Sequence, residues 1–288
     1  MGASKLDELI ETSLNLQART KALYRECVAA FVVFAGDDPS VYTAALVERW
    51  LFELLKEREP QTVNVYRKAI RYASKRFAKH VENGRDFAAI VEKVKAPTAE
   101  PRVPLTYEEA QLLLATCASD ELVDVRDRAL IVLALRSGLR RGGLHALELS
   151  GVKPPKITTI NKGGSRITFE ADAETLAALD AWSTCLRARG VTAGRVFLNV
   201  SKDKIRGPLS AFQIWRVFDR RAKQAGIRHV FPHLARHSTV TWLREEGKSS
   251  AEVSKLTGQT ERTIENIYTH VRTRGAVGDA LPSLFKRS

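Results

Sequence analysis

A short proline-rich stretch constrains the fold of this chain more than any other feature of its sequence. Residues 96–104 contain three prolines and show no hydrophobic periodicity. Proline has no backbone N–H and disfavours a helical conformation at the residue before it, so we expect this stretch to be extended. It predicts two domains, residues 1–95 and 105–288, joined by a linker over residues 96–104. A chain of 288 residues is long enough for two such domains.

The first domain is predicted to be a bundle of helices. Apolar residues recur at helical spacing over residues 6–14, 23–34 and 46–54. Ser40 can cap the third of these helices, and Pro60 is expected to end it. A further helix is predicted to follow this proline.

That further helix, predicted over residues 62–77, carries a basic face formed by Arg67, Lys68, Arg71 and Lys75. A basic face on an amphipathic helix is usually only solvated. The chain, however, has 46 Lys and Arg against 33 Asp and Glu, a net charge of +13. Such a surplus suits a polyanionic partner, because cations that neutralise phosphates release condensed counterions. We therefore expect these four residues to contact the phosphates of a nucleic acid; from charge alone, a membrane-surface or ribosome-associated protein is the alternative.

The second domain is predicted to be of the α+β class, so that the chain is mainly α-helical with a small antiparallel β-sheet. Thr106 and Glu109 form a capping box at the start of a helix, and Gly138 ends a buried helix over residues 128–136. Further helices are predicted over residues 173–189, 210–225, 234–246 and 251–256, from Thr260, and near Ala276.

The predicted sheet depends on one hairpin. Residues 157–160 and 166–169 are rich in β-branched and aromatic side chains. They flank Asn161-Lys162-Gly163-Gly164-Ser165, which has the composition of a hairpin turn.

The cysteines and the first residues of the chain indicate the cellular compartment of the protein. Cys27, Cys117 and Cys185 form no CxxC pair and have no nearby His at metal-ligand spacing. Scattered thiols fit a reducing cytosol and argue against a disulfide framework or a structural zinc. The chain start lacks the layout of a signal peptide, and the longest apolar run, residues 27–35, is too short to cross a bilayer. We expect a cytoplasmic, nucleoid-associated protein without metal, cofactor or membrane contact.

Five residues of the second domain are candidates for chemistry, and each also has an ordinary structural interpretation. Arg140 follows a helix end, Lys162 sits at a hairpin tip, and Tyr268 could be a core aromatic. His233 and Arg236 are one helical turn apart and therefore share a face. Together they are the groups needed to break a phosphodiester without a metal. Two guanidiniums can bind the non-bridging oxygens, a lysine can protonate the leaving oxygen, a histidine can move a proton, and a tyrosine can attack.

Several boxes in the second domain resemble the signature segments of tyrosine recombinases of the phage integrase family. One is Leu133-Ala134-Leu135-Arg136-Ser137-Gly138-Leu139-Arg140-Arg141-Gly142-Gly143-Leu144, and another is His233-Leu234-Ala235-Arg236-His237-Ser238. The others are Leu256-Thr257-Gly258-Gln259, the segment Ile267-Tyr268-Thr269-His270-Val271, the hairpin of residues 161–166 and the opening stretch 104–110. Residues 1–95 look like the core-binding domain of the same family.

The resemblance implies a DNA strand transferase that works through a covalent bond to Tyr268. Arg140 and Arg236 would clamp the phosphate, Lys162 would be the general acid, and His233 would assist proton transfer. The product would be a 3′-phosphotyrosine and a free 5′-hydroxyl, with four protomers on two recombination sites exchanging strands through a Holliday junction. A type IB topoisomerase and a non-cleaving architectural relative are the alternatives.

This sequence departs from the family pattern at two positions. Gln259, the sixth candidate site residue, stands where the family usually has His or Trp, and Gly143 stands where an acidic residue is common. An amide can still donate a hydrogen bond to a phosphate oxygen, but it cannot carry charge or a proton. The apolar tail over residues 276–285 is expected to dock either on its own domain or on a neighbouring subunit.

Overall fold

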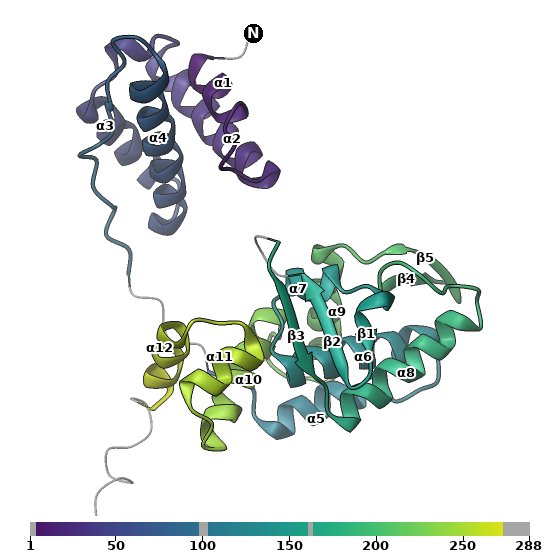
Figure 1. Cartoon of the computed structure of the whole chain (residues 1–288). Helices are drawn as coiled ribbons and strands as arrows, with labels where there is room; N and C mark the ends of the chain where they lie inside the picture. Colours follow the sequence, from purple (N-terminus) through teal and green to yellow (C-terminus); the bar gives the residue numbers. More distant parts are fainter. Residues whose placement is uncertain (1–3, 98–102, 161–163, 273–288) are drawn as a thin grey trace, which may run out of the picture. The chain divides into compact units, whose positions relative to one another are not determined.

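The computed structural model describes residues 4–97, 103–160 and 164–272, the last six of these as backbone only. The chain divides into two compact units, residues 1–99 and 100–288. This division falls inside the stretch expected to be the linker. Each unit is described here by itself (Figure 1).

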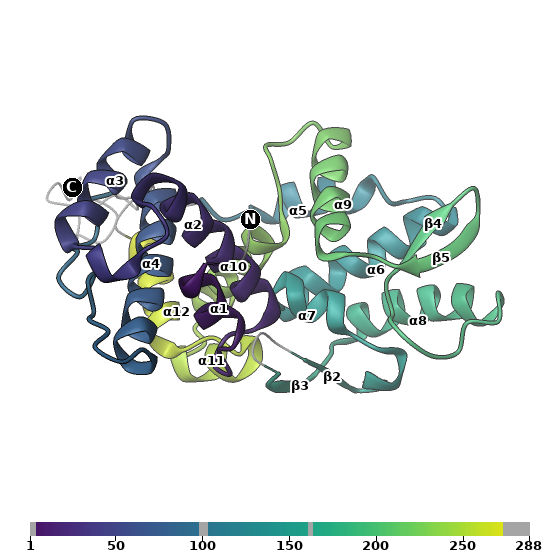
Figure 2. The same cartoon turned by 90° about the horizontal axis from the view of Figure 1, so that it is seen from above.

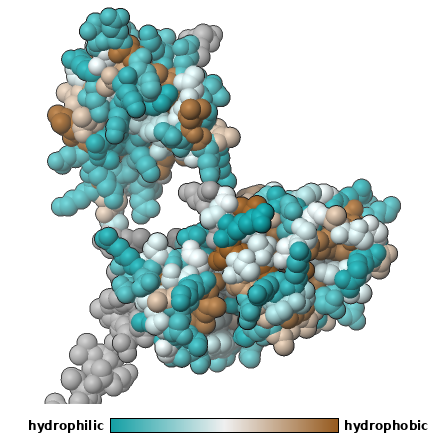
Figure 3. All heavy atoms as spheres, viewed as in Figure 1, coloured by the Kyte–Doolittle hydropathy of each residue, from teal (hydrophilic) through white to brown (hydrophobic). Residues whose placement is uncertain are grey.

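Over residues 4–97 the N-terminal unit is a bundle of four helices and one short 3₁₀ helix. These elements are α1 (Lys5–Glu11), α2 (Ala18–Ala35), η1 (Pro39–Val41), α3 (Ala44–Leu55) and α4 (Pro60–His80). Aromatic rings fill the centre, where Phe31 lies 5.0 Å from both Tyr42 and Trp50 between ring centroids. Such edge-on contacts add to the apolar area buried by the helices. The face of this unit seen in Figure 3 is mostly hydrophilic.

Two boundaries in this unit differ from the sequence-based expectation. Ser40 lies inside η1 and does not cap α3; the cap is Thr43, whose hydroxyl accepts from Leu46 N–H at 3.1 Å. Pro60 is the first residue of α4, whereas α3 already ends at Leu55. Both corrections have the same cause. A proline in the first helical turn removes an N–H that has no intrahelical partner, so Pro39 can start η1 and Pro60 can start α4.

The C-terminal unit is built around α6, most of which is buried. Helices of this unit are α5 (Tyr107–Ala115), α6 (Leu122–Ser137), α7 (Arg141–Ala146), η2 (Leu149–Gly151), α8 (Ala173–Arg187), α9 (Ala211–Gln224), α10 (Pro232–Glu245), α11 (Ser250–Thr257) and α12 (Glu261–Arg272). Helix α6 lies between α8 and α9 (Figure 2). The capping box of Thr106 and Glu109 at the start of α5 is confirmed, as is Gly138 at the end of α6.

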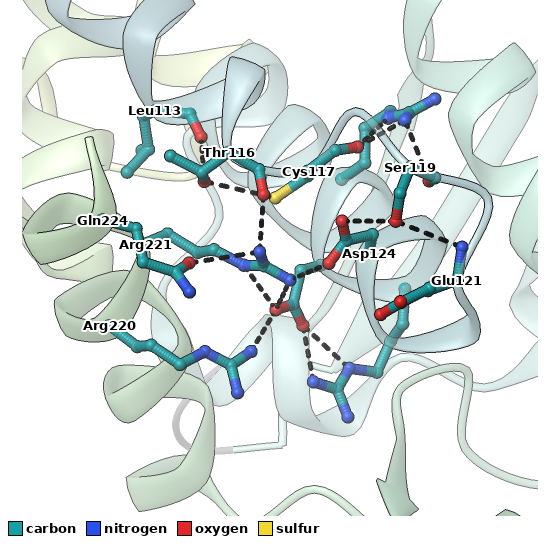
Figure 4. Close-up of polar contacts among 12 residues, drawn as sticks. Leu113, Thr116, Cys117, Ser119, Glu121, Asp124, Arg220, Arg221 and Gln224 are labelled. Atoms are coloured by element: carbon teal, nitrogen blue, oxygen red, sulfur yellow. Dashed lines mark hydrogen bonds and ion pairs between the residues drawn. The ribbon is translucent and has the colours of Figure 1, made fainter. Parts of the chain in front are cut away.

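A buried charged cluster joins α6 to α9. Asp127 is fully buried and accepts hydrogen bonds from Arg126 at 2.6 Å, from Arg221 at 2.8 Å and from Arg220. Arg221 also donates to Asp124 Oδ1 at 2.6 Å, a contact seen in Figure 4. A buried charge is tolerated only when paired and hydrogen-bonded. The cluster therefore fixes the position of α9 against the central helix.

Two small antiparallel sheets complete this unit. The first has the order β1 (Val152–Lys153), β2 (Lys156–Ile160) and β3 (Arg166–Glu170). The predicted hairpin strands are thus confirmed, with Thr158 opposite Thr168 and Ile160 opposite Arg166.

The second sheet pairs β4 (Leu198–Ser201) with β5 (Lys204–Pro208) and was not predicted. Its two-residue turn is made by Lys202 and Asp203, which both have positive φ, 48° and 56°. Glycine or asparagine usually supplies such angles, so the sequence carried no turn signal here. All in all the expected fold class, mainly α with small antiparallel sheets, is confirmed.

Candidate active site

Arg140 is placed by the end of α6. Gly138 adopts a left-handed conformation, with φ 58° and ψ 25°, and its N–H caps the helix at Ala134 O. The chain then turns, and Arg140 becomes the N-cap residue of α7. Its half-buried guanidinium donates to Gly258 O at 3.4 Å. The glycine predicted to end α6 therefore also sets where this arginine lies.

Arg236 lies on α10 and is almost fully buried, with 2% of its surface exposed. Its Nη1 donates to Thr257 O at 2.9 Å and to Gly138 O. The Nη2 atom has no hydrogen-bond acceptor among the residues that the structure describes. Arg236 thus joins the end of α6 to the end of α11 and keeps one donor unused.

Gln259 follows the end of α11, where Gly258 adopts φ 63° and ψ 32° and caps the helix. The main-chain oxygen of Gln259 accepts from Ser254 Oγ at 2.6 Å, which holds this turn against α11. The side chain is 6% exposed, and within the described part of the chain its Nε2 finds no acceptor. A second buried donor is therefore left unused close to the carbonyls that bind the two arginines.

The electrostatics of this cluster favour an anion. Burial, together with the charge of Arg140, lowers the pKa of Arg236 to about 9. Neither arginine forms an ion pair with a carboxylate of the described residues. A buried polar group without a partner is costly, and an unpaired buried charge is more so. An oxyanion that reached Arg140, Arg236 and Gln259 would satisfy these donors, and we call the set of these three residues the anion pocket.

The other candidate residues are less fully placed. His233 is exposed in the first turn of α10, one turn before Arg236. Tyr268 lies on α12, of which only the backbone is described at this point. Helix α12 packs on α10 and α11 through the buried side chains Val240, Val253 and Ile264. Lys162 and the tail over residues 276–285 lie outside the described residues.

Sequence reasoning overlooked what holds the arginines in place. The partners of Arg140 and Arg236 are backbone carbonyls of Gly138, Thr257 and Gly258. A carbonyl is present at every residue, so no residue type could have indicated these contacts. Of the remaining histidines, His145 has a structural contact, since its Nδ1 lies 2.7 Å from Leu209 O.

Nothing in the described ranges offers a cluster of three or more His, Cys, Asp or Glu side chains that could hold a metal. The three cysteines are free thiols, two of them buried. Among the described residues no helix is both long and apolar enough to cross a membrane.

Comparison with known proteins agrees with this arrangement of residues. The sequence profile of the phage integrase family matches residues 104–274, more than half of the chain. The protein belongs to the phage integrase family. It is therefore a tyrosine recombinase, an enzyme that cleaves and rejoins DNA. The resemblance found in the signature boxes is confirmed.

Named relatives of this recombinase include XerC proteins. Tyrosine recombinase XerC of Xanthomonas campestris pv. campestris is 26% identical over 269 residues, covering 91% of this chain and 81% of the relative. The XerC protein of Actinobacillus pleuropneumoniae serotype 7 is 30% identical over 182 residues, covering 62% of this chain and 58% of the relative.

Solved structures of recombinases share the fold. The XerH site-specific recombinase bound to palindromic difH substrate, a post-cleavage complex, aligns with a TM-score of 0.72 at 18% identity. That alignment covers 97% of this chain and 84% of XerH. A lambda integrase tetramer bound to a Holliday junction aligns with a TM-score of 0.70 at 18% identity, over 91% of this chain and 75% of the integrase.

The basic face of α4 in this recombinase is only partly free. Arg67 donates from Nε and Nη2 to Val91 O, at 3.0 and 2.7 Å, so its guanidinium holds the chain that follows α4. Lys68 and Lys75 are exposed and Arg71 is half-buried. Of the four residues expected to contact DNA, Arg67 is thus engaged within its own unit.

Proposed function

We propose that this protein is a site-specific recombinase that cuts duplex DNA with the hydroxyl of Tyr268 and rejoins it to a partner strand through a Holliday junction. The observation that carries the proposal is the anion pocket. Arg236 Nη2 and Gln259 Nε2 are buried donors without an acceptor in the described residues, and Arg140 lies beside them. A scissile phosphate would supply the negative charge and the acceptor oxygens that these donors do not find in the described residues.

In the cleavage step the Tyr268 oxygen forms a bond to phosphorus and the bond from phosphorus to the 5′-oxygen breaks. Arg140 and Arg236 neutralise the non-bridging oxygens, where negative charge grows in the transition state. Gln259 adds a neutral hydrogen bond to the same oxygens. The products are a 3′-phosphotyrosine and a 5′-hydroxyl.

Two residues would move the protons in this step. Lys162 is assigned as the general acid that protonates the leaving 5′-oxygen, and His233 helps take the proton from the Tyr268 hydroxyl. Because one phosphodiester replaces another, the 5′-hydroxyl of a partner strand can reverse the attack and reseal the DNA. The scheme needs neither a metal nor a nucleotide cofactor.

The partner is double-stranded DNA that carries a specific site, bound by four protomers on two sites. The XerH and lambda integrase complexes, with difH substrate and with a Holliday junction, support this choice of partner and assembly. The exposed Lys68 and Lys75 and the half-buried Arg71 of α4 are assigned to the DNA backbone. Salt should weaken the binding steeply, as counterions are released.

The test begins by selecting a duplex from a random library with the Tyr268→Phe protein, so that binding is separated from cutting. A nick is then placed beside the site in the selected duplex, so that the small fragment released by cleavage diffuses away and the covalent protein–DNA adduct accumulates. The wild-type protein should form this adduct and Tyr268→Phe should not. A shifted complex without any adduct would point to an architectural protein. Relaxation of a supercoiled plasmid that lacks the selected site would point to a type IB topoisomerase.

A further inference from the structure

The start of the C-terminal unit is held by side chains rather than by a β-ladder. Arg228 donates from Nη1 to Val103 O at 2.8 Å and from Nη2 to Pro104 O at 2.5 Å. The same guanidinium binds the carboxylate of Glu109 at 2.8 and 3.0 Å. Residues 103 and 104 are thereby fixed against the first turn of α5.

Leu105 is held by two side chains of α10. Ser238 Oγ accepts from Leu105 N–H at 2.8 Å, and Trp242 Nε1 donates to Leu105 O at 3.0 Å. The indole of Trp242 also stacks on Tyr107, with ring centroids 4.6 Å apart and planes 16° from parallel. We call residues 103–105, with Arg228, Ser238 and Trp242, the linker clamp.

The linker clamp meets α10 close to the anion pocket. Ser238 and Trp242 are four residues apart and so lie on one face of the helix. Arg236, two residues before Ser238, reaches the carbonyls of Gly138 and Thr257. Val240 of the same helix packs on Ile264 of α12, the helix that carries Tyr268. A small displacement of α10 would therefore move both the phosphate-binding arginine and the helix of the nucleophile.

The hydroxyl group of Ser238 uses its donor and one acceptor position within the protein. It is fully buried, it accepts from Leu105 N–H, and it donates to Leu234 O at 2.9 Å within α10. Removal of this hydroxyl leaves a buried backbone N–H without its acceptor, which is unfavourable unless the neighbouring backbone shifts. The groups free to shift are residues 103–105 and α10.

We propose that Ser238 is a positioning residue for strand cleavage, an inference that rests on the proposed function. It fixes α10 to residues 103–105, so that the guanidinium of Arg236 and the helix of Tyr268 keep their places around the phosphate. The linker clamp is also where the covalent connection from the N-terminal unit meets the catalytic helices.

The experiment measures adduct formation on the selected, nicked duplex under single-turnover conditions. Ser238→Ala should slow cleavage about 10-fold to 100-fold, because displacement of a catalytic group by about 1 Å costs on this order. Binding of the same duplex should change less than about twofold, because phosphate contacts outside the pocket are kept. Ser238→Thr keeps the hydroxyl and should form the adduct at about the wild-type rate. Trp242→Phe keeps the ring stack, loses the Nε1 donor, and should slow cleavage in the same way.

Thr241→Val is the matched control. Thr241 is a buried hydroxyl residue on α10, but it donates only to His237 O of its own helix, at 3.2 Å. Its loss should leave the rate of adduct formation unchanged. Hydrogen exchange of the backbone amides of α12 adds a readout that does not need DNA, and it should be faster in Ser238→Ala than in Thr241→Val.

The outcomes separate the two proposals. If the wild-type protein forms no adduct, the proposed function fails, and the amide exchange still decides whether Ser238 positions α12. If wild type forms the adduct and Ser238→Ala forms it equally fast, the positioning role is overturned. It is also overturned if Ser238→Ala loses binding and cleavage in parallel, or if Ser238→Thr fails to restore the rate. Should Ser238→Ala not fold, the comparison of Trp242→Phe with wild type carries the test.

Discussion

Arg140 and Arg236 donate to the carbonyl oxygens of two consecutive residues, Gly258 and Thr257, so that the two guanidiniums are drawn to the same turn at the end of α11. Like charges brought together in this way repel, and burial adds to the cost. An arrangement of this kind is stabilised when an anion binds between the two groups. This repulsion is the physical basis for the proposal that the pocket binds a phosphate.

The affinity of the pocket for an anion should fall as the pH rises above about 9. Burial and the charge of Arg140 lower the pKa of Arg236 from its ordinary value of 12.5 to about 9. A bound anion favours the charged form and raises this pKa again. Binding therefore takes up protons above pH 9, and the loss of affinity approaches about tenfold per pH unit. Sulfate is a suitable probe because its charge is constant in this range.

Isothermal titration calorimetry in two buffers of different ionisation enthalpy would detect the proton uptake. The reference is Arg236→Gln, in which the steep fall of sulfate affinity with pH should disappear. A wild-type affinity that is constant from pH 8 to about pH 10 would contradict the assignment.

Substitutions of Gln259 should change the cleavage rate in opposite directions. Gln259→Leu removes a buried donor of the pocket and should lower the rate about 10²-fold to 10³-fold. Gln259→His supplies a donor that can also carry charge and should raise the rate, most clearly below neutral pH. Adduct formation on the selected duplex gives both rates. If Gln259→Leu cleaves at the wild-type rate, the amide does not contact the phosphate.

Gly138→Ala should destabilise the protein and slow cleavage. The φ of 58° disfavours any residue with a Cβ by about 1–2 kcal/mol, and the new Cβ would lie 3.1 Å from Thr257 Cγ2. Thr257→Ser removes that methyl group and keeps the hydroxyl that donates to Val253 O. The double variant Gly138→Ala/Thr257→Ser should recover the part of the loss that is due to crowding. Urea unfolding measures the stability, and equal values for wild type and Gly138→Ala would refute the role of this turn.

Asp127→Asn should destabilise the C-terminal unit by about 3–5 kcal/mol, because it removes the charge that neutralises the buried Arg126 and Arg221 and turns an NH2 donor toward one of the two guanidiniums. Arg220→Gln is the comparison. The side chain of Arg220 is 46% exposed, so its loss should cost no more than about 1 kcal/mol. Denaturant midpoints of the two variants would show the difference. Similar small losses for both would mean that the cluster contributes little to stability.

The sequence predicted the parts of the fold that local chemistry determines. The capping box of Thr106 and Glu109, the helix end at Gly138 and the strands of the first hairpin depend on near neighbours. The turn of Lys202 and Asp203 could not be predicted, because both residues have positive φ and the sequence offers no glycine or asparagine there. Pro60 was expected to end one helix, but it begins the next one, α4. A proline is compatible with both positions, so its presence alone does not tell them apart.

The residue types of the candidate site could be predicted from the sequence, but the hydrogen bonds that hold these residues in place could not. Arg140, Arg236 and Gln259 were identified from their motifs, and the structure brings them to the end of α11. The roles of all six candidate residues, these three together with Lys162, His233 and Tyr268, stay predictions. The linker clamp could not be foreseen, since Ser238 and Leu105 are separated by 133 positions in the chain. A hydrogen bond between a serine and a distant backbone N–H leaves no periodic pattern.

The way in which Arg236 is fastened has a consequence for how this site can evolve. Its known anchors are main-chain oxygens at 138 and 257, and these are retained whichever side chains occupy the two positions, provided that the backbone path is kept. Amino acids around the pocket can therefore be exchanged, as at Gln259, with the guanidinium staying where it is. The position of the Arg236 guanidinium therefore depends on the backbone path at 138 and 257 and not on the identity of the side chains there.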